Sequence, residues 1–171
     1  MALMTSIAAY VRTILSGNAP HDRFRAGEKG ALSPAAQRGL ALFEGKARCV
    51  HCHTGFNSTD GGYRNIGVGM DKENPDLGRY AVTKSEADRG AFKAPSLRDV
   101  ARRGPYMHDG SKNILEEVVT FYNQGGRKNP WLSREIQPLN LTAREQTDLV
   151  AFLQALTGEI APQVSSPPPF P

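Results

Sequence analysis

The sequence predicts an all-α fold with long loops and one small β-hairpin. Apolar residues recur at helical spacing in four segments, which begin near residues 5, 34, 114 and 143. Residues typical of helix starts precede the last three of these segments. Helical signal is low from residue 54 to 94, where only the short runs 63–68 and 80–82 are strand-like, and these are expected to pair as the hairpin.

Length and composition indicate one soluble domain with a tail. The chain has 171 residues, of which 39% are hydrophobic and 22% charged, with a formal net charge of +4. Because the basic residues are spread along the chain, a solvated surface is favoured over a nucleic-acid face, although a docking patch for an acidic redox partner is compatible with this charge. No apolar run reaches the length of a membrane span.

Residues 5–16 are expected to form an amphipathic helix that Gly17 ends. Its apolar face needs a partner, either this domain or another chain. Residues 17–32 have the composition of a loop, so we assign residues 1–32 to an N-terminal helix and linker. The apolar face consists of Ile7, Val11, Ile14 and Leu15.

The second helix is expected to begin at Ser33 as N-cap with Pro34 in the first turn, and to end at Gly45. Residues 95–102 allow a short helix at most, before Gly104. The predicted buried stripe of the second helix is Ala36, Leu40 and Phe43.

Two capping boxes predict the remaining helices, Asn113 with Glu116 and Thr142 with Glu145. The first of these helices should end at Gly125-Gly126 and the second at Gly158. We assign residues 33–160 to one helical domain and the proline-rich residues 161–171 to an extended tail. The predicted apolar faces are Leu115, Val118, Val119 and Tyr122, and Leu149, Val150, Leu153 and Leu156.

Residues 49–53 read C-x-x-C-H, the attachment motif of c-type haem. The thiols of Cys49 and Cys52 are about one helical turn apart, so both can add to the vinyl groups of one porphyrin edge. The imidazole of His53 can then bind the iron as its proximal ligand. The motif therefore predicts a cytochrome c-like helical domain around one covalently bound haem c, with the long loop 54–94 around the haem edges.

Other readings of the motif fit the sequence less well. A zinc site needs about four ligands, and this chain has two cysteines with no matching His pair. A thioredoxin-like pair would follow a strand, whereas a helical pattern precedes Cys49. A disulfide between Cys49 and Cys52 would be strained and would leave His53 without a role.

The second axial position of the iron has three candidates downstream of the motif. Met107 is favoured by chemistry, because methionine is the usual partner in cytochromes c. Tyr122 is favoured by position, because a helix presents it on the buried face. His108 is also within reach, and each of these side chains is more often an ordinary core or surface residue.

Four stretches together resemble the C-terminal haem domain of the bacterial di-haem cytochrome c peroxidase and MauG family. The similarity covers about residues 3–158, nearly the whole chain. The family also has an N-terminal domain with its own C-x-x-C-H motif and the peroxide-binding haem, which has no counterpart in this sequence. The stretches are residues 33–43 (SPAAQRGLALF), 94–100 (APSLRDV), 105–110 (PYMHDG) and 115–119 (LEEVV).

The resemblance assigns further residues. The slot that holds a methionine ligand in the peroxidases falls on Tyr122, and the MauG branch has tyrosine there. A phenolate oxygen favours ferric iron, so the expected reduction potential is below that of a His/Met cytochrome. A family calcium ion would take the carbonyl groups of Arg103 and Pro105. Arg98 and His108 are candidates to contact a haem propionate and the ligand side of the haem, with ordinary hydrogen-bonding roles as the equal alternative.

These observations predict an electron-transfer module of the MauG and di-haem peroxidase type. It would exchange electrons or oxidising equivalents with a second haem domain or a partner protein, with no nucleic acid and no membrane span. The alternatives are a peroxidase that uses hydrogen peroxide at this haem and a structural haem subunit of a larger redox complex. Because haem c is attached outside the cytoplasm, we expect a periplasmic protein. Residues 1–15 do not resemble a signal peptide, so we expect either a removed signal or a piece of a longer protein.

Overall fold

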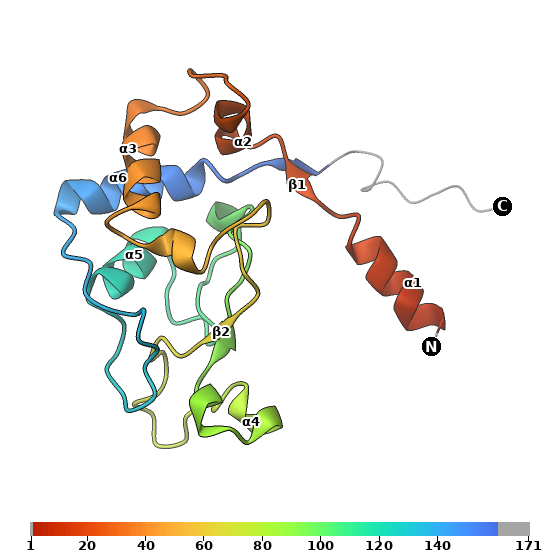
Figure 1. The fold of residues 1–171 in the computed structure, drawn as a ribbon, viewed down its shortest axis with the longest axis vertical. Coiled ribbons are helices and arrows are strands. Elements are labelled where there is room, and N and C mark those ends of the chain that lie inside the picture. Colours follow the sequence, from red (N-terminus) through yellow and green to blue (C-terminus); the bar gives the residue numbers. More distant parts are fainter. Residues whose placement is uncertain (1, 161–171) are drawn as a thin grey trace.

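Two helices, α3 (Pro34–Glu44) and α6 (Ala143–Gln154), cross each other in the upper part of the view in Figure 1. The structure is a computed structural model, and it describes residues 2–160. A third helix, α5 (Leu115–Asn123), packs against α6, and together the three helices carry most of the hydrophobic core. The largest side chains of this core that lie on helices are Leu40, Phe43, Leu115, Val119, Leu149, Phe152 and Leu153.

The helix starts predicted at residues 33 and 142 are confirmed. The hydroxyl of Ser33 accepts a hydrogen bond from the backbone N–H of Ala36, at 3.2 Å. The capping box of α6 is complete, because Thr142 and Glu145 each accept a hydrogen bond from the other's backbone N–H, at 3.2 and 2.7 Å. Ala36, Leu40 and Phe43 of α3 and Leu149, Val150 and Leu153 of α6 lie in the core as predicted, and the fold is mostly helical with a few short strands.

The start of α5 differs by one residue from the prediction. Its N-cap is Ile114 and no side chain caps it, so the box of Asn113 with Glu116 is wrong. Instead the backbone N–H of Asn113 donates to the carboxylate of Glu117, at 2.7 Å. The helix begins one residue later than expected. The glutamate whose carboxylate accepts the backbone N–H is accordingly Glu117 and not Glu116.

The N-terminal helix α1 (Ala2–Val11) ends earlier than predicted and projects away from the other helices (Figure 1). The strand β1 (Ser16–Gly17) pairs in antiparallel register with β4 (Glu159–Ile160). A strand needs extended backbone, so this pairing ends the helix before Ile14. The four residues of the predicted apolar face, Ile7, Val11, Ile14 and Leu15, are all exposed.

The predicted loop 17–32 contains a short helix, α2 (Pro20–Arg25). It lacks a buried apolar stripe, which is why periodicity did not reveal it. Its sequence signals are Pro20 in the first turn and Asp22, whose carboxylate accepts from the N–H of Ala19 at 3.0 Å.

The predicted hairpin is wrong in its second strand. β2 (Tyr63–Arg64) pairs with β3 (Phe92–Lys93), whereas the run at 80–82 lies in the single-turn helix α4 (Tyr80–Thr83). A short apolar run does not distinguish a strand from one helical turn. In the structure, the Tyr80 ring on this turn lies 4.1 Å from the guanidinium of Arg89.

The loops also contain three short 3-10 helices: η1 (Cys49–His51), η2 (Glu86–Asp88) and η3 (Val100–Arg102). The last is the short helix allowed at 95–102. Within residues 2–160, no helix has the length and apolar character required to cross a membrane. The predicted tail, 161–171, lies outside the described residues.

The crossing of α3 and α6 depends on Gly39. A Cβ atom at this position would lie 2.0 Å from the carbonyl oxygen of Asp148 and 2.7 Å from the Cβ of Phe152. Beside it, the guanidinium of Arg38 donates to both carboxylate oxygens of Asp148, each at 2.7 Å. The two helices are therefore in backbone contact at this point.

We expect Gly39→Ala to lower the free energy of unfolding by about 1–3 kcal/mol, because the added methyl group forces α3 away from α6. Chemical denaturation of the purified protein measures this change. Gly30→Ala is the matched control, since no atom lies within 4 Å of its added Cβ, and its effect should stay within about 0.5 kcal/mol. Equal stability of the two variants would contradict the close contact.

Candidate functional site

A cavity of about 500 Å³ lies between the three core helices and the loop that follows the C-x-x-C-H motif. This volume is within the range of small-molecule and cofactor sites. Its walls are mainly apolar, so it suits a large hydrophobic ligand better than an ion. Apolar side chains that line it from the helices are Phe43, Val118, Val119, Leu149 and Leu153.

The motif begins where α3 ends, and this junction brings it to the cavity wall. The backbone N–H of Gly45 donates to Ala41 and closes α3, and Arg48 then takes a left-handed conformation before η1. The N–H of His53 donates to the carbonyl of Cys49 at 2.9 Å, so residues 49–53 form one compact turn. Cys49, Cys52 and His53 consequently line the same cavity.

Neither Cys49 nor Cys52 forms a disulfide. Burial raises the pKa of Cys49 to about 12, and burial also raises the pKa of Cys52. Zinc and redox sites use thiolates, and residues 2–160 contain no cluster of three His, Cys, Asp or Glu side chains that would hold a metal ion. The thiol pair therefore suits attachment to an organic group better than ion binding.

One nitrogen of the His53 imidazole, Nδ1, is hydrogen-bonded within the protein. Nδ1 lies 3.0 Å from the carbonyl oxygen of Ser58, which can only accept, so Nδ1 carries the proton. Burial lowers the pKa of His53, against the opposing effect of backbone contacts with Ser58 and Pro95. The lone pair is left on Nε2, the arrangement in which histidine binds iron.

All three predicted candidates for the opposite ligand also line the cavity. Tyr122 extends from α5, and burial raises the pKa of its hydroxyl. Met107 and His108 lie in a loop, where the imidazole of His108 stacks on Phe92 with ring centres 3.6 Å apart. Tyr122 is the one of the three that a helix carries.

The remaining predicted site residues fall into two groups. Arg103 and Pro105 line the cavity, and the guanidinium of Arg103 donates to the carbonyl of Ser96. Arg98 is not among the lining residues. It is buried and bonded to Asp22 and to the carbonyl of Phe56. Its predicted contact with a propionate stays a prediction, as does calcium at the carbonyl groups of Arg103 and Pro105.

Sequence reasoning missed three cations at the cavity, Arg48, Arg64 and Lys93. Arg64 is paired with Asp60 at 2.6 Å. Arg48 donates to the side chain of Gln137 and Lys93 to the carbonyl of Ala94, so their charges are available to an anionic ligand. No motif marks them, because their approach to the cavity depends on the loop path.

No family model matches the chain. The chain is 46% identical over 158 residues to the methylamine utilization protein MauG of Methylorubrum extorquens. The aligned region covers 91% of this chain and 44% of that protein. It is 41% identical over 185 residues to a cytochrome c peroxidase of Denitromonas iodatirespirans, which covers 89% of this chain and 48% of that protein. The chain thus spans about half the length of these relatives.

Solved structures give the same result. A MauG-like protein associated with microbial copper homeostasis superimposes with a TM-score of 0.76 and 36% identity, covering 82% of this chain and 52% of that one. The dihaem peroxidase BthA of Burkholderia thailandensis superimposes with a TM-score of 0.65 and 26% identity, covering 82% and 46%. The predicted resemblance is confirmed in sequence and in fold.

We expect the chain produced without its cofactor to bind an apolar fluorescent dye in the cavity. Val119→Phe places a ring in this space and should lower dye binding, as measured by fluorescence titration. Val82→Phe is the control, because Val82 is 85% exposed and lies outside the cavity wall. Equal dye binding by the two variants would show that the dye binds elsewhere.

Proposed function

Because this chain is a relative of the C-terminal haem domain of the MauG and di-haem cytochrome c peroxidase family, we propose that it is a c-type cytochrome electron-transfer module. It exchanges electrons or oxidising equivalents with a second haem or a partner protein. The observation that carries the proposal is the meeting of Cys49, Cys52, His53 and Tyr122 on one apolar cavity.

Each of these residues has a role that its surroundings support. The thiols of Cys49 and Cys52 would hold the haem through thioether bonds, each thiol adding its S–H across one vinyl group. His53 supplies Nε2 to the iron, because Ser58 holds the proton on Nδ1. Tyr122, which lines the same cavity, would supply its phenol oxygen as a second ligand, and a nearby cation would favour the phenolate form.

Haem c, when bound, supplies an iron centre that gains or loses one electron. With His53 and Tyr122 both as ligands, the site would suit electron transfer better than peroxide binding. The apolar walls exclude water. Within residues 2–160, neither Arg48 nor Lys93 has an ion pair with a carboxylate, and both cations suit the anionic propionate groups.

A second candidate function is a peroxidase at this haem. The names of the relatives favour it, since they include cytochrome c peroxidases. It requires Tyr122 to leave the iron and open a binding position. A structural haem subunit of a larger redox complex is the third possibility, and the exposed apolar residues of α1 favour it. We further propose that the protein acts in the periplasm, where haem c is attached.

Tyr122→Phe should change the absorption spectrum of the ferric protein and raise its reduction potential, because the variant loses an anionic oxygen ligand. Spectroscopy and redox titration of protein made in a host that attaches haem c measure both. Tyr106→Phe is the matched control, because Tyr106 also lines the cavity but its hydroxyl donates to the carbonyl of Val100 at 3.0 Å. An unchanged spectrum in Tyr122→Phe would remove Tyr122 as a ligand, and a peroxide turnover that rises would favour the second function.

The double variant Cys49→Ser, Cys52→Ser should release its haem into acidified organic solvent, whereas the haem of the wild-type protein should stay with the polypeptide. The reason is that serine hydroxyls do not form the thioether bonds. Absorbance of the two phases after extraction gives the result. Haem that extracts equally from both proteins would exclude covalent attachment, and a colourless wild-type protein would overturn the proposed function.

A further inference from the structure

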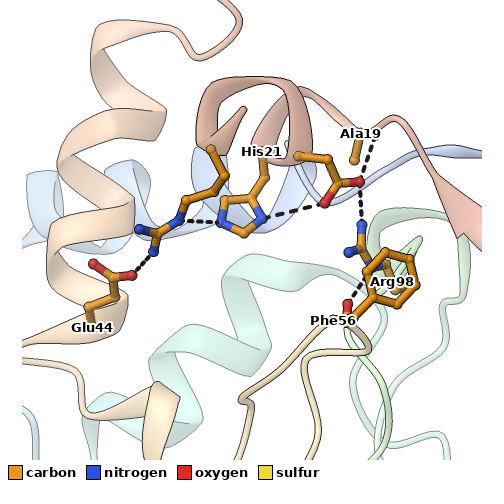
Figure 2. A network of polar contacts seen from close by, with 7 residues as sticks. Ala19, His21, Glu44, Phe56 and Arg98 are labelled. Carbon is orange, nitrogen blue, oxygen red and sulfur yellow. Dashed lines mark hydrogen bonds and ion pairs between the residues drawn. The ribbon is translucent and has the colours of Figure 1, made fainter. Parts of the chain in front are cut away.

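Arg98 is a buried cation with two strong partners from distant parts of the chain. Its side chain is 9% exposed. One guanidinium nitrogen, Nη1, donates to the carboxylate of Asp22 at 2.5 Å, and Nε donates to the carbonyl oxygen of Phe56 at 2.7 Å. The same guanidinium lies 4.2 Å from the centre of the Phe56 ring. Figure 2 shows Arg98 between the two partners.

The Asp22 end of this bridge is firmly attached to the helical core. The neighbouring residue, His21, donates its backbone N–H to the carbonyl of Ala155 at 3.2 Å. The His21 ring also meets the Phe152 ring edge-on, with centres 5.4 Å apart. Phe152 lies on α6 and is 1% exposed, so α2 is held against the core of the protein.

The Phe56 end of the bridge lies in the loop that orients His53. Ser58, two residues after Phe56, supplies the carbonyl oxygen that binds His53 Nδ1. The N–H of Ser58 donates to Gly55 at 3.0 Å, so residues 55–58 form one turn. A second tether, from the hydroxyl of Thr59 to the carbonyl of Ala94 at 2.7 Å, holds the far end of the loop.

We infer that Arg98 is a positioning residue for His53, which links helix α2 to the loop whose Ser58 carbonyl orients the imidazole. The inference rests on the proposed function, because it assigns His53 to the iron. The hydrogen bond on the non-ligating nitrogen of a histidine sets the orientation of the ring and its basicity toward the metal. A shift of this loop by a few tenths of an ångström would therefore change the orientation of the His53 imidazole relative to the iron.

This role differs from the predicted contact of Arg98 with a propionate. The guanidinium already shares its charge with Asp22, and Arg98 is not among the residues that line the cavity. The bridge depends on the forked shape of the guanidinium, because one planar group donates hydrogen bonds to both Asp22 and Phe56. A lysine ammonium in its place is a compact point charge on a flexible stem and lacks this fork.

The test is Arg98→Lys in the haem-loaded protein, compared with Arg38→Lys. Arg38 also uses two nitrogens, at 2.7 Å each, but both bind Asp148 and join α3 to α6 away from loop 54–60. The two substitutions are chemically identical, and each replaces a guanidinium that uses two nitrogens, at least one of them in an ion pair with a carboxylate. The measurements are the reduction potential, the ferric absorption spectrum and hydrogen exchange of peptides that cover residues 54–60.

In Arg98→Lys we expect a shifted potential, an altered ferric spectrum and exchange in the loop that is about tenfold faster, the factor typical for loss of a hydrogen bond to a charged group. In Arg38→Lys all three should match the wild-type protein, even though its melting temperature falls. A second matched pair, Asp22→Asn against Asp148→Asn, applies the same comparison from the carboxylate side and covers the case in which Arg98→Lys does not fold.

Three results would overturn the inference. The first is an Arg98→Lys protein with wild-type potential, spectrum and loop exchange. The second is an equal shift in both arginine variants, which would indicate a merely structural role for Arg98. In both of these results the wild-type protein binds haem, so the proposed function stands. The third is a wild-type protein without haem, which overturns the proposed function and the inference with it.

Discussion

The contact between α3 and α6 is the constraint on which the rest of the structure depends. Gly39 lets the two backbones touch, since a side chain there would overlap the carbonyl of Asp148. The ion pair of Arg38 with Asp148 lies at the same crossing. Because the C-x-x-C-H motif begins a few residues after α3 ends, the position of α3 on α6 also decides where the two thiols and His53 lie.

The cavity follows from this arrangement and from the polar contacts around it. Helices α3, α5 and α6 supply apolar walls, while loops supply the groups that suit a charged or coordinating ligand. One line of contacts runs from α6 through α2 and Arg98 to the loop after His53, so the orientation of a proposed iron ligand depends on residues far from it in the sequence. Such support is common for metal ligands, whose basicity depends on the partners of their second nitrogen.

Errors in the sequence predictions have a common physical cause. The helix predicted over 5–16 ends at Val11 because Ser16–Gly17 pairs with Glu159–Ile160, a partner more than a hundred residues away. The predicted hairpin is wrong in its second strand. β2 pairs with β3, and the run at 80–82 forms one helical turn. Short elements with little burial carry weak periodicity, so their pairing depends on tertiary contacts.

Features that depend on near neighbours in the chain could be predicted from the order of residues alone. These include the Ser33 and Thr142 helix starts, the buried stripes of α3 and α6, and the spacing of Cys49, Cys52 and His53. The tertiary structure decided that Arg98 binds Asp22, 76 residues earlier, that Gly39 meets Asp148, and that the motif shares one cavity with Tyr122. The physical reason is range, because caps and stripes are set within a few residues, whereas a close approach of distant backbones exists only once the core has packed.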